Sequence, residues 1–207
     1  MRQAPIVALA LLFAACKAPP ASGPAAAERP APAEAAATPA PEPAAAPSGS
    51  LRVDLPAAGT IGFEGFGPAE FGASAEEVRM AWGGDLGDAA PSEPGGCHYL
   101  IPATQAKQGY KIAFMIEGGK FVRIDVASGQ ITAPGGGRIG MSSAELQRLY
   151  GNALSSMPHK YVEGGHYLSV AGDAAPGKLV FETDANGKVT EWRVGVPPQV
   201  DYIEGCS

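Results

Sequence analysis

The chain has 207 residues and a formal net charge of −6 at pH 7, from 15 basic and 21 acidic side chains. Residues 51–207 carry all of this net negative charge and have no basic stripe, which argues against nucleic-acid binding and against electrostatic adhesion to anionic lipid. This part of the chain is long enough for one substantial core or for two small cores packed together.

The N-terminal stretch MRQAPIVALALLFAAC predicts an exported protein. One basic residue, Arg2, precedes an apolar run from Ile6 to Ala15 that is too short to cross a hydrocarbon layer of about 30 Å. We therefore expect a signal peptide over residues 1–15. The end of the run, LFAAC, resembles the lipobox of bacterial lipoproteins, which implies that Cys16 becomes a lipid-bearing N-terminus. The alternative is an ordinary signal peptide followed by an incidental cysteine.

The next segment, residues 17–50, is rich in alanine and proline. It has fourteen Ala and nine Pro but no Ile, Leu, Val, Met or aromatic residue, so it cannot bury enough surface to offset the entropy of ordering. We expect residues 16–50 to form a disordered tether that joins the lipid anchor to a folded part. Lys17 rather than Asp follows the cysteine, and by resemblance to enterobacterial lipoproteins this implies the outer membrane. The sequence leaves open whether the folded part faces the periplasm or the exterior.

Two further cysteines, Cys97 and Cys206, remain if Cys16 is acylated. In an oxidising compartment such a pair predicts a disulfide. Two buried free thiols, or a bridge between two chains, are the alternatives.

Two parts of the chain match each other when shifted by 68 residues. The letters HYL occur at 98–100 and again at 166–168, and each time a helix signal precedes them. Ser74 with Glu77, and Ser142 with Glu145, have the spacing of a capping box, and a glycine (Gly83 or Gly151) follows each short apolar helix pattern.

Strand patterns repeat in the same order after each predicted helix. KIAF (111–114) matches KLVF (178–181), and VRIDV (122–126) matches WRVGV (192–196) and LRVDL (51–55). The fold predicted is α+β, with tandem duplicated units of one helix plus antiparallel β-sheet, the helices packed on one face of the sheet. Repeat 1 would span residues 51–126, and repeat 2 residues 127–207 with a C-terminal extension.

The second predicted helix resembles the helix motif of the SmpA/BamE family of small outer-membrane lipoproteins. The matching residues are Gly140, Met141, Ser142, Glu145, Leu146, Leu149 and Gly151. The same motif in tandem, followed each time by antiparallel strands, resembles the β-lactamase inhibitor protein fold. These resemblances imply the duplicated architecture and an envelope setting.

Chemistry-bearing motifs are weak. The histidines His98, His159 and His166 show no H-x-x-x-H spacing, and the cysteines show no C-x-x-C spacing, so we expect no metal site and no cofactor. No G-x-S-x-G elbow and no carboxylate pairing typical of a glycosidase is present, so we expect no catalytic residues and no enzyme.

A binding face is the remaining hypothesis. If the shared apolar residues face the helices, strand alternation sends another set of side chains to the opposite, open face: Tyr99, Tyr167, Phe121, Arg123 and Arg193. Tyrosine and arginine are enriched in binding hot spots. The alternative is that these are ordinary surface residues, with Arg123 and Asp125 a solvated pair.

The sequence therefore predicts a lipid-anchored envelope protein that binds a protein partner and has no catalytic activity. The resemblances imply an adaptor in envelope assembly, or alternatively an inhibitor of an envelope-directed hydrolase of the lysozyme or β-lactamase type. A third alternative is carbohydrate or peptidoglycan binding, in which aromatic side chains of the sheet stack on sugar rings.

Overall fold

The computed structural model of the chain describes Ala57 and residues 60–207. The expected signal peptide (1–15), the lipidated Cys16, the tether (16–50) and the strand expected at 51–55 lie outside the described residues. Residues 60–207 belong to one compact unit. Within residues 60–207, no helix combines the length and the apolar character that a membrane span requires.

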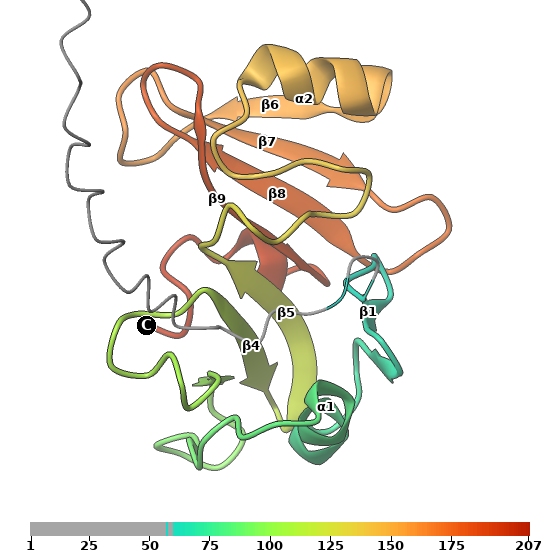
Figure 1. Cartoon of the computed structure of the whole chain (residues 1–207), viewed down its shortest axis with the longest axis vertical. Helices are drawn as coiled ribbons and strands as arrows, with labels where there is room; N and C mark the ends of the chain where they lie inside the picture. The colour runs from blue at the N-terminus through green and yellow to red at the C-terminus, as the bar shows by residue number, and fades with distance from the viewer. Residues whose placement is uncertain (1–56, 58–59) are drawn as a thin grey trace, which may run out of the picture. The chain divides into compact units, whose positions relative to one another are not determined.

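The main element is one antiparallel sheet of seven strands (Figure 1). Its strands, in sheet order, are β3 (His98–Leu100), β4 (Ile112–Glu117), β5 (Lys120–Val126), β9 (Val189–Gly195), β8 (Lys178–Thr183), β7 (His166–Ala171) and β6 (Ser155–Pro158). The strands of the two matching segments meet at the centre, where Ile124 of β5 pairs with Val194 of β9. Two residues each from β1 (Gly65–Phe66) and β2 (Ala69–Glu70) form a separate small ribbon.

Two short α-helices accompany the sheet, α1 (Ala75–Trp82) and α2 (Ser143–Tyr150). Both begin with the predicted capping box. The Glu77 carboxylate accepts a hydrogen bond from the backbone N–H of Ser74 at 2.7 Å, and the Ser74 hydroxyl accepts one from the N–H of Glu77 at 3.3 Å. Ser142 and Glu145 repeat both bonds at the same distances. The predicted helix starts are therefore confirmed.

The predicted α+β class is wrong, because the described residues form a mainly β structure. Each helix has only eight residues, whereas the strands join into a single seven-stranded antiparallel sheet. A capping box marks where a helix begins but not how much of the fold it makes. The hydrogen bonds between β5 and β9 join the strands of the two matching segments into one continuous sheet.

The hydrophobic core lies on one face of this sheet. Phe114 of β4, Trp192 of β9 and Phe181 of β8 are almost fully buried there, together with Val78 of α1 and Leu146 of α2. Aromatic rings interlock across the core, and the ring centres of Phe66 and Phe114 lie 5.0 Å apart.

The edge strand β6 is exposed along its four residues. It ends at Pro158, which has no N–H to offer to another strand. Proline on an exposed edge discourages the addition of a further strand. The short 3-10 helices η1 (Gly151–Ala153), which precedes β6, and η2 (Gln199–Asp201) complete the described elements.

Candidate binding groove beside the C-terminal segment

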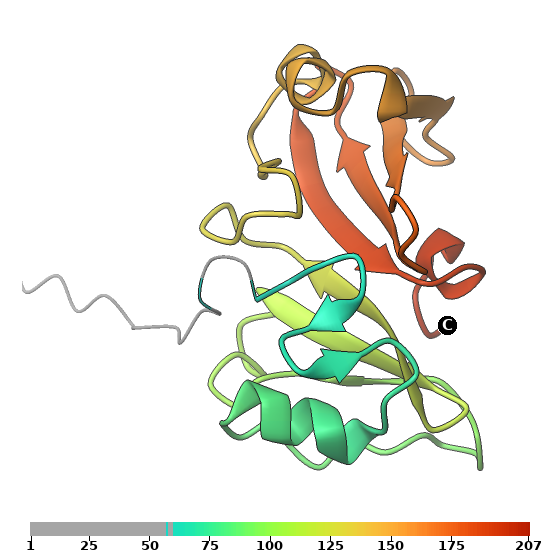
Figure 2. The same ribbon diagram turned by 90° about the vertical axis from the view of Figure 1, so that its right-hand side faces the viewer.

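The C-terminal segment, residues 196–207, covers part of the sheet face opposite the main core. Figure 2 shows α1 on one side of the sheet and this segment on the other. Val200, in η2, is fully buried and packs with Tyr167 of β7 and Val180 of β8 in a second, small cluster. The expectation of an open sheet face therefore does not hold at the centre of the sheet.

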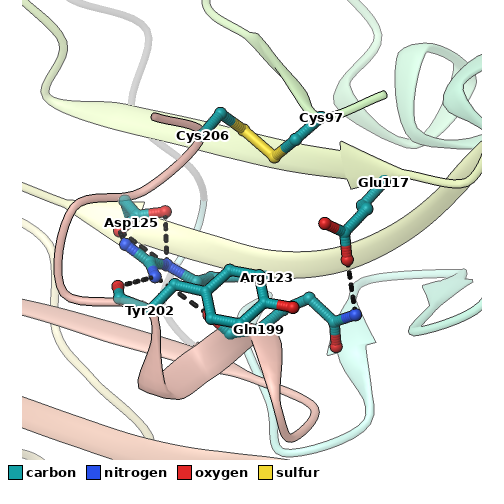
Figure 3. The surroundings of a disulfide bond; sticks show 7 residues. All are labelled: Cys97, Glu117, Arg123, Asp125, Gln199, Tyr202 and Cys206. Carbon is teal, nitrogen blue, oxygen red and sulfur yellow. Dashed lines mark hydrogen bonds and ion pairs between the residues drawn. A yellow bond between two sulfur atoms is a disulfide. The ribbon is translucent and has the colours of Figure 1, made fainter. Parts of the chain in front are cut away.

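A disulfide joins this segment to the edge of the sheet that β3 forms (Figure 3). The expected bond between Cys97 and Cys206 is present, with 5.3 Å between the Cα atoms and a separation of 109 positions in sequence. Cys97 directly precedes the edge strand β3. Such a bond is typical of secreted and envelope proteins, because the cytosol keeps thiols reduced.

Arg123 of β5 lies between the sheet and the C-terminal segment and holds the segment by hydrogen bonds to its backbone. Its Nε lies 2.9 Å from both carboxylate oxygens of Asp125, and its Nη1 donates to the carbonyl oxygens of Gln199 at 3.0 Å and Tyr202 at 2.6 Å (Figure 3). Gln199 also donates from Nε2 to Glu117 at 2.6 Å. Arg123 and Asp125 are only 4% and 5% exposed, so the pair is neither a solvated pair nor part of an exposed binding face.

Arg193 of β9 is the second buried arginine on this face. Its Nε donates to the carbonyl oxygen of Val200 at 2.6 Å, and its Nη1 pairs with Glu182 of β8. Arg193 is 3% exposed, because the segment takes up its guanidinium group. Like Arg123, it acts as an internal anchor for the segment rather than as an exposed binding residue.

His159 completes the buried polar network around Glu182. Its Nδ1 accepts hydrogen bonds from the backbone N–H groups of Tyr161 at 3.0 Å and Val162 at 3.1 Å. Since Nδ1 accepts, the neutral imidazole has its proton on Nε2, which lies 2.9 Å from Glu182 and donates to it. The His159 ring also stacks on Tyr167, with ring centres 4.4 Å apart.

The two tyrosines expected on the open face are also covered. Tyr167 is 7% exposed beneath His159 and Arg193. Tyr99 is half-buried, burial raises its pKa, and its hydroxyl lies next to Gly205 of the segment. Neither tyrosine therefore offers a free ring face to a partner.

Phe121 is on the opposite side from the one predicted. It is fully buried in the main core, with its ring centre 4.9 Å from that of Phe71. The register between β4 and β5 shifts at this point, since Arg123 pairs with Met115 whereas Phe121 pairs with the adjacent Ile116. The extra residue, Val122, breaks the alternation of faces, as a β-bulge does.

Beyond the covered centre, the same sheet face has an apolar groove of about 290 Å³. Residues of strands β6, β7, β8 and β9 line it, together with two residues of the C-terminal segment. The lining residues are Met157, Tyr167, Ser169, Lys178, Val180, Arg193, Asp201 and Ile203. Met157 and Ile203 are 63% and 36% exposed, so apolar side chains remain open to solvent at the groove. We call this hollow the groove.

The rim of the groove is polar. Lys178 Nζ lies 2.6 Å from the Asp201 carboxylate, and the hydroxyl groups of Ser155 and Ser169 lie 2.8 Å apart. Outside the lining of the groove, half-buried Glu191 of β9 is the strand partner of Glu182 of β8, and its burial and the charge of Glu182 raise the pKa of Glu191.

A second hollow, an open cleft of about 550 Å³, borders the same segment. Cys97, Cys206, Glu117 and Lys160 help to line it, and Asp201 and Ile203 line both the cleft and the groove. Asp201 and Ile203 therefore border both hollows, and we call residues 201–203 the wall between them. Within residues 60–207, no group of three histidine, cysteine or acidic side chains converges to hold a metal ion.

Sequence reasoning missed Met157 and Ile203, because both lie in irregular or polar surroundings without strand alternation. The only signal was a large apolar residue in SSMP (155–158) and in DYIEG (201–205), where neighbours are polar or small.

Comparisons with known proteins do not assign a family. No family model and no curated protein matches the chain. An extracellular protein containing an SCP domain from Bacillus anthracis str. Ames is similar in structure with 17% identity and a TM-score of 0.40, over 61% of this chain and 44% of that protein. A DUF4309 family protein (YjgB) from Bacillus subtilis subsp. subtilis str. 168 is similar in structure with 10% identity and a TM-score of 0.36. The match covers 60% of this chain and 78% of that protein. At TM-scores below 0.5, neither likeness assigns a fold or an activity to this chain.

Proposed function

We propose that this protein is a lipid-anchored binding protein of the bacterial envelope, which holds an apolar side chain of a partner protein in the groove. In this proposal Cys16 supplies the anchor at the outer membrane, residues 16–50 supply the tether, and the activity is binding rather than catalysis. The observation that carries the proposal is the exposure of Met157 and Ile203 at an apolar hollow, on a sheet face that is otherwise covered.

The composition of the groove supports a protein as the occupant. Apolar side chains that stay exposed around a hollow mark interaction sites more often than scattered apolar residues do. The volume of about 290 Å³ is at the lower end of the range for ligand pockets, which suits one or two side chains. The rim offers an ammonium donor on Lys178, a carboxylate acceptor on Asp201 and a hydroxyl on Ser169, and a peptide backbone has groups that match both kinds.

The burial of the tyrosines favours a protein over a glycan. Sugar rings stack on exposed aromatic faces, yet Tyr167, the aromatic residue of the groove, is only 7% exposed and already stacks on His159. An inhibitor of an envelope hydrolase remains a special case of the proposal, in which the partner protein is an enzyme.

A photo-crosslinking experiment in living cells tests the proposal. A benzophenone amino acid replaces Met157, and in a matched control it replaces Met80 of α1, which is 67% exposed on a different part of the molecule. We expect a discrete protein adduct from position 157 that is missing from position 80. Identical adducts from both positions, or none from position 157, would contradict the proposal.

Surface substitutions add a second test with its own control. Ile203→Asp places a charge in the wall of the groove and should abolish the adduct from position 157. Leu149→Asp makes the same kind of change on α2, where Leu149 is 46% exposed, and should leave the adduct unchanged.

A further inference from the structure

We infer that the Cys97–Cys206 disulfide regulates the groove, so that a dithiol reductant loosens the wall at Ile203, the residue of the wall that no buried anchor holds, and weakens binding there. The inference rests on the proposed function of the groove.

The attachment of the C-terminal segment differs along its length. Its first part is held from inside the protein, since buried Arg123 and Arg193 donate to the carbonyl oxygens of residues 199, 200 and 202, and Val200 is fully buried. This part needs no disulfide to stay in place.

The part after Tyr202 is held more weakly. Glu204 pairs with Lys160 at 3.3 Å, but these side chains are 57% and 55% exposed, and the Tyr161 hydroxyl donates to the same exposed carboxylate. Exposed ion pairs contribute little to stability. Ile203 itself is 36% exposed, so the disulfide at Cys206 is the one strong attachment in the described residues after Tyr202.

The disulfide can be reached from solvent without passing through the groove. Both cysteines are half-buried and line the open cleft, and neither lines the groove. A reductant can therefore enter the cleft while a partner occupies the groove.

The exchange reaction balances with a dithiol as the reductant. One thiolate of the dithiol attacks a sulfur of the Cys97–Cys206 bond, which forms a mixed disulfide and releases the other cysteine as a thiolate. The second thiol of the reductant then attacks the mixed disulfide, closes its own disulfide and releases the remaining cysteine. Two electrons and two protons pass to Cys97 and Cys206, and the dithiol is oxidised.

Release of Cys206 removes the covalent support of Ile203 and leaves the buried anchors at Arg123 and Arg193 intact. The groove then loses part of one apolar wall, while the sheet beneath it is unchanged. We therefore expect a local loss of binding rather than unfolding.

The test uses the purified mature chain and anilinonaphthalenesulfonate, a dye that fluoresces in apolar sites. Dye bound in the groove is identified by its loss in Met157→Asp and its retention in the matched control Met80→Asp. Treatment with dithiothreitol should raise the Kd of this dye roughly tenfold, which corresponds to about 1.4 kcal/mol. The double variant Cys97→Ser/Cys206→Ser should bind as weakly as the reduced protein and should not respond to dithiothreitol.

Hydrogen exchange of the same samples separates the possible failures. Reduction should speed amide exchange in residues 203–206 and leave the strands protected. Equal exchange there in both forms, or equal dye affinity, would overturn the regulation but leave the groove. Loss of near-ultraviolet circular dichroism on reduction would also overturn it, since the bond would then be needed for folding. If the oxidised protein has no dye site that depends on Met157, the proposed function fails. The exchange data then decide separately whether reduction of the disulfide releases residues 203–206.

Discussion

Nη1 of Arg123 donates a hydrogen bond of 2.6 Å to the carbonyl oxygen of Tyr202, a residue 79 positions later in the chain. The same guanidinium group binds Asp125, so one buried side chain links the central strand β5 to the C-terminal segment. The sheet face that the sequence pattern left open is closed by the chain itself.

Arg123→Met should destabilise the protein by about 3–5 kcal/mol, because it leaves the Asp125 carboxylate buried without its partner. Urea unfolding, followed by the free energy of unfolding, measures the loss. The double variant Arg123→Met/Asp125→Leu removes both charges and should recover most of it. If the single variant is as stable as the parent, the pair is not buried as described.

Ser142→Ala should cost about 1 kcal/mol, because it removes the hydroxyl that caps the backbone of α2. Ser74→Ala makes the same change on α1 and is the matched comparison.

The stability that the capping box of α2 contributes should also depend on pH. Hydrogen bonds from Ser142 lower the pKa of Glu145, so the contribution of this carboxylate is present above its ordinary pKa of 4.5 and is lost as the pH falls through the lowered value.

The free energy of unfolding, measured from pH 7 down to pH 3, should therefore approach that of Glu145→Gln at the acid end. A constant difference between the two proteins over this range would mean that the charge of Glu145 has no part in the cap.

Local signals in the sequence predicted local features well. The capping boxes predicted where both helices begin. The number of cysteines and the oxidising compartment expected for an exported protein indicated Cys97 and Cys206 as partners. Strand alternation predicted the wrong sheet face for Phe121, because a β-bulge shifts the register by one residue and has no recognisable sequence pattern here.

The cover over Arg123 and Arg193 was also invisible from the sequence. It depends on main-chain carbonyl groups of residues 199, 200 and 202, which carry no signature in any side chain. Residue type alone therefore indicated a binding surface at Arg123 and Arg193, whereas the structure shows buried arginines that hold the C-terminal segment. The exposed groove lies beside them.

Cys16→Ser should move the protein from the membrane fraction to the soluble fraction, if Cys16 carries the lipid. Fractionation and mass spectrometry of the mature N-terminus measure this. Lys17→Asp keeps the cysteine, and the resemblance to enterobacterial lipoproteins implies that it shifts the protein from the outer to the inner membrane. A Cys16→Ser protein that stays in the membrane fraction would contradict lipid anchoring at this residue.

Glu191→Gln should raise the Tm at pH 7, because burial and the neighbouring charge of Glu182 raise the pKa of Glu191 in the folded protein. A carboxyl group whose pKa is raised by folding favours the folded state at low pH, and this stability is lost as the pH rises through the raised value. The gain in Tm should therefore vanish below about pH 4, where the parent carboxyl is protonated in both states. Glu182→Gln is the contrasting variant, since Glu182 pairs with Arg193 and accepts from His159, and it should lower the Tm at pH 7. A Glu191→Gln protein with an unchanged Tm at pH 7 would show that solvent reaches this carboxylate and stabilises its charge.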